Sequence, residues 1–177
     1  MRPGPLFCFA RGGEPDFFIL CNLARVAMDG GRYDEAMTLL GTAMQACRRV
    51  HDEFGLAVCL SLVGRYYWLR GQLAAALANG REALLRFRET DFLHFSLIGI
   101  FQQSLAIVDC EHWEMGATLL AATEGIGKPA RKPDFRNHLD ALEKIRGHVP
   151  VPAFERAWAR GLAMGVEEAF GLALGAE

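Results

Sequence analysis

The chain has 177 residues, a length that suits one domain or one array of helical repeats with a closing element. Hydrophobic residues make up 51%, so material for a core is ample, and the formal net charge is −2. Nucleic-acid-binding proteins gain much of their affinity by neutralising phosphates. Because a basic excess is absent, we expect no direct nucleic-acid partner.

The cysteines and the hydropathy pattern favour a cytoplasmic location. The 5 cysteines are odd in number and include no Cys-x-x-Cys pair, which is typical of free thiols in a reducing compartment. Leu6 to Ala10 is a short apolar run, whereas a secretory signal needs ~7–15 apolar residues. Leu56 to Gly64 is the best candidate for a membrane span but falls well short of the ~18 residues required. We therefore expect neither a secretory signal nor membrane contact.

The predicted elements begin with a flexible N-terminal arm over residues 1–13, which contain two prolines and three glycines. Asp16 can cap a helix by accepting backbone N–H bonds. Apolar residues then recur at three- and four-residue spacing, which predicts the core-facing side of a first helix. These residues are Phe17, Leu20, Leu23, Ala24 and Ala27. Gly30-Gly31 breaks this helix, and a second one is predicted from Tyr33 to Val50.

The same plan returns twice along the chain. Helices are predicted over residues 53–70 and 73–89, and again over residues 92–109 and 113–125. No segment shows sustained two-residue alternation, so the pattern indicates an all-α fold. We expect a right-handed superhelical stack of about three helical hairpins over residues 14–126.

A motif at the start of each second helix sets the repeat length. Gly31-Arg32-Tyr33-Asp34-Glu35-Ala36 is echoed by Gly71-Gln72-Leu73-Ala74-Ala75-Ala76, and more loosely by Glu111-His112-Trp113-Glu114-Met115-Gly116. Small residues recur with the same period, and we expect them to form the seams where paired helices approach closely. The pairs are Ala24 with Ala36, Gly64 with Ala76, and Ser104 with Gly116.

This pattern resembles the tetratricopeptide repeat, W-x-x-L-G-x-x-Y followed by A-x-x-x-F. The second repeat carries the likeness best, with Leu60-x-x-Val63-Gly64-x-x-Tyr67 and then Ala76. Two departures stand out. The period from Gly31 to Gly71 exceeds the roughly 34 residues of the family, so the helices or turns are longer. Gly80 also stands where the family has a large residue.

Residues 127–177 depart from the repeat. A linker is predicted from Gly127 to Pro133, and Asp134 can cap a helix that ends near a break over residues 148–152. Two short helices are predicted over residues 154–162 and 166–174. Since terminal repeats need a different closing element, we expect these C-terminal helices to cap the stack.

The tail adds a second resemblance. Leu119-Leu120-Ala121-Ala122-Thr123-Glu124 and Phe154-x-x-Ala157-Trp158-x-x-Gly161 resemble the end of the C-terminal sensor region in bacterial signal-transduction ATPases and LuxR-type transcription regulators. This likeness implies a regulatory role in signalling. It carries neither ATPase nor DNA-binding activity, because Gly127-Lys128 lacks the remaining P-loop residues and no helix-turn-helix is evident.

Candidate catalytic and metal-binding residues are few. Residues 109–114 include several metal-ligating types, but neighbours on a turn point in different directions, so a solvated turn is the better interpretation. None of the 5 histidines has a serine or cysteine at a recognisable motif spacing. We therefore expect no enzymatic activity, no metal and no cofactor.

The resemblance to tetratricopeptide arrays places the first helix of each hairpin along a concave groove. That register predicts three groups of lining residues: Phe18, Cys21, Arg25, Met28 and Asp29; Val58, Ser61, Arg65, Trp68 and Leu69; and Ile98, Phe101, Leu105, Val108 and Asp109. Arg25 and Arg65 occupy equivalent positions, and a planar guanidinium suits carboxylates and phosphates. We expect the partner to contact mainly Arg25, Arg65, Trp68, Phe18, Met28 and Phe101.

The leading hypothesis is a non-enzymatic interaction or sensor module that binds a peptide or protein partner in this groove. Several alternatives stay open. The arginines could instead be solvated, or paired with Asp29 or a glutamate. The groove could be filled by the C-terminal helices or by a second copy of the chain. The protein could also be a homodimerisation unit, or an enzyme or small-molecule carrier whose pocket forms only in the fold.

Overall fold

The computed structural model describes residues 16–90, 92–127 and 135–175, and over these ranges it is all-α. The predicted arm over residues 1–13, most of the predicted linker and the expected cap at Asp134 lie outside the described residues. Each helix within the described part of the chain is too short or too polar to cross a bilayer.

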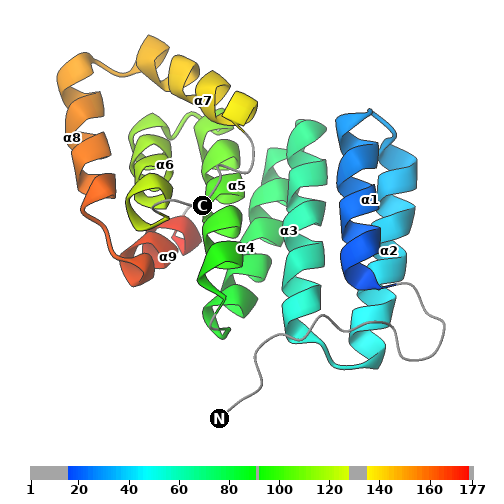
Figure 1. Cartoon of the computed structure of the whole chain (residues 1–177). Helices are drawn as coiled ribbons and strands as arrows, with labels where there is room; N and C mark the ends of the chain where they lie inside the picture. The colour runs from blue at the N-terminus through cyan, green and yellow to red at the C-terminus, as the bar shows by residue number, and fades with distance from the viewer. Residues whose placement is uncertain (1–15, 91, 128–134, 176–177) are drawn as a thin grey trace.

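Six helices form three hairpins that stack side by side, as Figure 1 shows from α1 and α2 through to α5 and α6. The helices are α1 (Phe17–Asp29), α2 (Tyr33–Arg49), α3 (Glu53–Leu69), α4 (Leu73–Arg88), α5 (Leu93–Asp109) and α6 (Trp113–Ile126). The first helices contact one another, α1 with α3 and α3 with α5, while α2 also contacts α3 and α4 also contacts α5. The predicted stack of three hairpins is confirmed.

The turn inside each hairpin contains one residue with a left-handed backbone. Gly31 and Gly71 have φ angles of 73° and 69°, which glycine adopts without steric cost. Glu111 holds the equivalent place in the third hairpin with a φ of 67°. The motif that revealed the repeat length therefore marks a turn with a fixed backbone geometry.

The small-residue seams are buried in all three hairpins. A Cβ atom added at Gly64 would lie 3.2 Å from the Ala76 carbonyl oxygen and from the Gly80 amide nitrogen, so α3 and α4 approach closely there, as predicted. In the third hairpin a Cβ at Gly116 would meet Val108 Cγ2 at 2.3 Å. Gly116 thus packs on α5 through Val108.

Gly80 lies at a close approach between α4 and α5. A Cβ there would come within 2.0 Å of Gln103 Oε1, and the Gln103 Nε2 donates a hydrogen bond to the Leu77 carbonyl at 3.3 Å. The cavity beside Gly64, Gly80 and Gly99 measures about 10 Å³, too little for a ligand. The missing large side chain therefore makes room for Gln103.

The outer side of α1 differs from the sequence expectation. Helical spacing predicts that Leu23 faces the core, yet it is 49% exposed, and Ile19 and Val26 beside it are 59% and 54% exposed. We call these three residues the α1 edge stripe. Helical spacing does place them on a single face, but in the described structure that face carries no packed helix.

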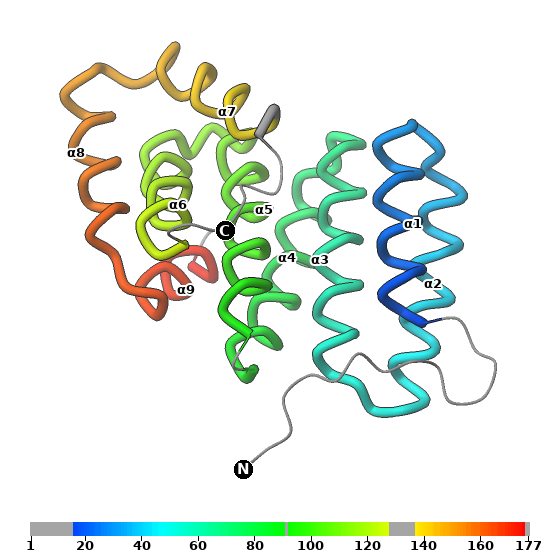
Figure 2. Tube along the Cα trace, viewed as in Figure 1, coloured from blue at the N-terminus to red at the C-terminus, as the bar shows by residue number. Residues whose placement is uncertain are grey.

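Three helices close the other end of the stack: α7 (Phe135–His148), α8 (Val151–Leu162) and α9 (Val166–Leu174). Figure 2 shows α7 crossing beside α5 and α6, α8 running along α6, and α9 turning back toward α5. A Cβ at Gly161 would lie 2.1 Å from the Thr118 carbonyl oxygen, so α8 and α6 are in very close contact. α8 begins at Val151, earlier than predicted, because Pro152 fits in a first turn where its missing N–H is not needed.

Candidate binding groove

A groove of about 850 Å³ runs across the first helices of the three hairpins. Side chains from α1, α3 and α5 form most of its lining, and Asn137 of α7 borders it. The helices expected to form the concave surface are the ones that do so. We call this site the inner groove.

The inner groove includes most of the residues that the repeat register placed there. All five expected from α1 line it, four of the five from α3, and two from α5. They are Phe18, Cys21, Arg25, Met28, Asp29, Val58, Ser61, Arg65, Leu69, Ile98 and Phe101. Trp68, Leu105 and Asp109 instead line a second hollow of about 480 Å³ that also borders α7.

The two equivalent arginines lie in different environments. Arg65 has a side chain only 9% exposed, and its Nη2 forms an ion pair with Asp29 Oδ1 at 3.0 Å. Arg25 is exposed, with its Nη2 3.5 Å from Asn22 Oδ1. Pairing with Asp29 was one of the alternatives for these arginines, and it holds for Arg65. Arg25 is the one whose guanidinium is open to solvent.

α7, the first of the three C-terminal helices, covers part of α5, the first helix of the third repeat. Phe101 is 5% exposed, and its ring stacks on the His138 ring with centroids 6.0 Å apart. Leu105, 2% exposed, belongs to the same cluster as Ala141 and Ile145 of α7. The alternative in which C-terminal helices fill the groove therefore applies to the third repeat, and Phe101 packs mainly inside the protein.

Trp68 connects α3 to α5 and α7 and does not line the inner groove. Its Nε1 donates a hydrogen bond to Asp109 Oδ2 at 2.7 Å, and Lys144 Nζ donates to Asp109 Oδ1 at 2.6 Å. Asp109 thus accepts hydrogen bonds from two helices at once. This arrangement places α7 over the end of the groove.

Phe18 and Phe95 of the inner groove belong to a cluster of phenylalanine rings that sequence reasoning did not identify. The Phe95 ring lies 5.8 Å from Phe18 and 4.9 Å from Phe54, and Phe54 lies 4.4 Å from Phe92, measured between centroids. The available signal was phenylalanine near the start of every first helix. Because helix starts align in a stack of hairpins, these rings converge.

Polar side chains complete the groove lining. Ser61 Oγ donates a hydrogen bond to Gln102 Oε1 at 2.6 Å, linking α3 to α5, and Asn22 and His94 also face the groove. Within the described residues, no group of three histidine, cysteine or acidic side chains is arranged to hold a metal ion. The groove therefore offers hydrogen-bonding groups and the exposed Arg25 guanidinium beside an aromatic surface.

The comparison with known families agrees with this architecture. A family model described as tetratricopeptide repeat matches residues 17–89, the range of α1 to α4. Comparison with curated proteins and with solved structures gave no significant match. The first two hairpins thus form a region similar to tetratricopeptide repeats, which generally mediate protein interactions and are typically non-catalytic.

Proposed function

We propose that this protein is a non-enzymatic interaction module that binds a peptide or a protein segment in the inner groove. The observation that carries the proposal is the groove itself, about 850 Å³ along three aligned first helices. Its size and shape suit an extended or helical segment, and ligand sites of this size combine apolar surface with a few fixed polar groups.

The side chains that line the groove indicate which side chains a partner segment should carry. Phe18 and Arg25 both face the groove from α1 and lie about 10 Å apart along the helix axis at 1.5 Å per residue. Phe95 and Ile98 extend the apolar end, and Asp29 and Arg65 lie beyond Arg25. A partner segment with an apolar side chain about 10 Å from a carboxylate would match both ends.

The finer part of the proposal is a regulatory sensor role in bacterial signalling, in the cytoplasm. Its support is the resemblance of the C-terminal segment to the sensor region of such regulators. That segment includes Gly161, the residue at which α8 contacts α6. An ATPase or helix-turn-helix domain encoded next to this chain would support the role, whereas a neighbouring gene for an unrelated process would speak against it.

The test selects peptides from a random library on the immobilised protein and measures Kd by fluorescence anisotropy. Arg25→Ala and Ile98→Ala should each weaken a selected acidic–apolar peptide by about tenfold, equivalent to about 1.4 kcal/mol. Arg81→Ala is the matched control, because Arg81 is an exposed arginine on α4 outside the groove lining. Circular dichroism establishes that each variant is folded.

The proposal is wrong if the selected peptides bind both groove variants as tightly as the parent protein. Loss of binding in Arg81→Ala alone would point to the outer surface of the stack and would contradict it as well.

A further inference from the structure

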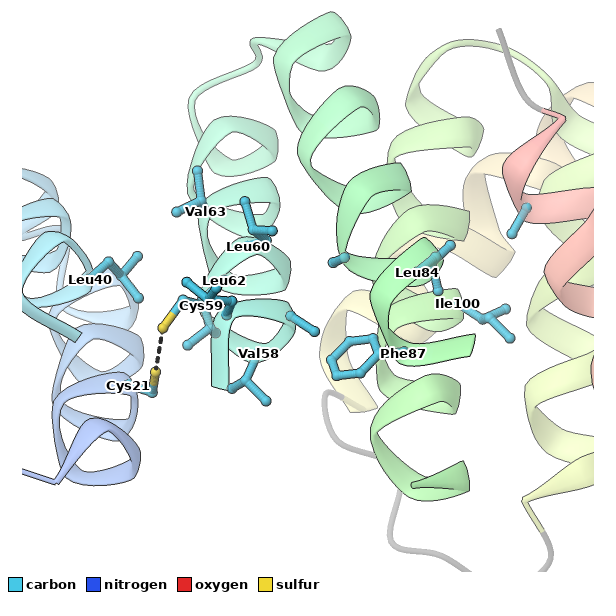
Figure 3. Close-up of a cluster of buried hydrophobic side chains, with 14 of the residues drawn as sticks. Cys21, Leu40, Val58, Cys59, Leu60, Leu62, Val63, Leu84, Phe87 and Ile100 are labelled. Atoms are coloured by element: carbon cyan, nitrogen blue, oxygen red, sulfur yellow. Dashed lines mark hydrogen bonds between the residues drawn. The ribbon is translucent and has the colours of Figure 1, made fainter. Parts of the chain in front are cut away.

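Three buried cysteines from two repeats converge beneath the inner groove. Cys21 of α1, Cys47 of α2 and Cys59 of α3 are 4%, 1% and 0% exposed. The Sγ atoms of Cys21 and Cys59 lie 3.6 Å apart, the contact drawn as a dashed line in Figure 3. Cys47 belongs to the same buried cluster as Cys21 and Cys59. These residues form the thiol cluster.

A glycine in α3 leaves space for the Cys47 sulfur. A Cβ at Gly55 would lie 2.5 Å from Cys47 Sγ, so any larger residue there would press on the thiol. The cluster therefore depends on close approach of α2 to α3 as well as of α1 to α3.

The three thiols differ in their access to the groove. Cys21 is part of the groove lining, whereas Cys47 and Cys59 lie behind it. Hydrogen bonding with Cys59, and then burial, raise the pKa of the Cys47 thiol. Hydrogen bonding with Cys21, together with burial, raises the pKa of Cys59. A reagent that enters through the groove therefore meets Cys21 first.

The Cys21–Cys59 geometry also suits a covalent bond. A disulfide has an S–S length of about 2.05 Å, so these two sulfurs must approach by roughly 1.5 Å. They come from neighbouring first helices that already contact each other, and they are 38 residues apart in sequence. We expect small changes in side-chain torsion and helix position to supply that approach.

We propose that the thiol cluster is an oxidation site for a hydroperoxide, in which the Cys21 sulfur attacks the peroxide oxygen and Cys59 is its disulfide partner. In the first step the O–O bond breaks and Cys21 sulfur forms an S–O bond. The sulfur is oxidised to a sulfenic acid, the thiol proton passes to the departing oxygen, and the hydroperoxide is thereby reduced to an alcohol or water.

In the second step the Cys59 sulfur attacks the Cys21 sulfur. An S–S bond forms, the S–O bond breaks, and the hydroxyl leaves as water with the Cys59 proton. A dithiol reductant reverses the reaction by thiol–disulfide exchange. The disulfide joins the first repeat to the second, and this chemistry does not depend on what the groove binds.

The experiment treats the reduced full-length chain with hydrogen peroxide near neutral pH and maps its peptides without reduction. The expected product is a crosslink between the Cys21 and Cys59 peptides, lighter by two hydrogen atoms than their sum and lost on addition of dithiothreitol. In Cys59→Ser the crosslink should disappear, and dimedone should label Cys21 as its sulfenic acid. Cys110→Ser is the matched control, since Cys110 lies outside the thiol cluster and its loss should leave the crosslink unchanged.

The proposal is overturned if the crosslink joins other cysteines, or if Cys21 stays reduced at a peroxide dose that oxidises Cys110. It is also overturned if folded Cys59→Ser gives no dimedone adduct at Cys21. If near-ultraviolet circular dichroism shows that Cys59→Ser does not fold, the test rests on the peptide map of the parent chain, in which the Cys21–Cys59 crosslink must be found.

Discussion

At the scale of single residues, the turn of the third hairpin carries backbone strain. Glu111 adopts the left-handed φ of 67° that glycine adopts at positions 31 and 71. A residue with a Cβ atom is disfavoured in this conformation by roughly 1–2 kcal/mol. The loosest copy of the repeat motif is therefore also the one with the least suitable turn residue.

Replacing Glu111 with glycine tests whether its left-handed backbone destabilises the fold. Glu111→Gly should raise the free energy of unfolding by about 0.5–1 kcal/mol, because relief of strain outweighs the added chain entropy of glycine. Gly71→Ala should lower it by a similar amount. Urea denaturation measures both changes, and equal stabilities of all three proteins would contradict the prediction.

The thiol cluster predicts a dependence of stability on pH. The pKa values of Cys47 and Cys59 are raised above the ordinary value of about 9, so above that pH the unfolded chain releases protons that the folded chain keeps. The associated stability is complete below pH 9 and decreases as the pH rises further, by up to about 1.4 kcal/mol per pH unit for each thiol.

Cys47→Ala isolates the contribution of this thiol. The variant should lose less stability than the parent between about pH 8 and pH 10, since one of the raised pKa values is gone. Urea denaturation with a phosphine reductant measures both series. Parallel losses in the two proteins would show that the Cys47 thiol titrates normally in the fold.

At the scale of elements, one carboxylate links α7 to two other helices, in addition to the apolar packing of α7 on α5. Asp109, with a side chain 23% exposed, receives Lys144 of α7 and the Trp68 indole of α3. Lys144 is 51% exposed, so solvent weakens its part of the interaction. Asp109 therefore couples the placement of α7 to the first helices of the second and third repeats.

Asp109→Asn should lower the free energy of unfolding by about 1 kcal/mol, because the Trp68 hydrogen bond keeps an acceptor while the ion pair with Lys144 is lost. Asp140→Asn, an exposed change on α7, is the control and should alter stability by less than about 0.5 kcal/mol. Hydrogen exchange should speed up in α7 of the Asp109 variant. Unchanged exchange there would show that Asp109 does not hold the helix.

Most element boundaries could be predicted from the sequence, for identifiable reasons. Gly30-Gly31 and Gly71 interrupt strong helical periodicity, so α1 and α3 end, and α2 and α4 begin, close to the predicted residues. The start of α8 was predicted too late because Pro152 was treated as a breaker, although the first turn of a helix accepts proline.

The candidate site was predictable only in part. Repeat register placed Arg25 and Arg65 on the same surface, because equivalent residues of stacked hairpins face the same way. Register alone did not place α7, whose path depends on contacts far along the chain, so it could not show that Phe101 and Trp68 contact this helix. The Arg65–Asp29 pair also depends on side-chain conformation that spacing does not specify.

At the scale of the whole molecule, the C-terminal helices close the stack through contacts between backbones. A Cβ at Gly161 would lie 2.1 Å from the Thr118 carbonyl oxygen and 2.7 Å from Ala121 Cβ, and a Cβ at Gly125 would lie 2.7 Å from the Leu162 carbonyl oxygen. Since a helical backbone cannot move aside as a flexible side chain can, these glycines fix the distance between α6 and α8. The buried faces of α6 depend on that contact.

Gly161→Ala should lower the free energy of unfolding by about 1–3 kcal/mol, because α8 must move away from α6. Gly171→Ala is the matched control, as a Cβ at Gly171 of α9 has no neighbour within 4 Å. It should be neutral or stabilising by up to about 1 kcal/mol. Thermal denaturation compares the two variants, and equal midpoints would mean that the α6–α8 contact adapts without cost.

The two ends of the stack are not equivalent, and the α1 edge stripe shows why. The residues one and two repeats after Leu23 are Val63 and Gln103, which are 6% and 2% exposed, and Gln103 contacts the second helix of the hairpin before it. A designed hairpin joined ahead of Phe17 could pack on the apolar α1 edge stripe. At the opposite end, α7, α8 and α9 would first have to be removed. The stack can therefore be extended by further hairpins at its α1 end only.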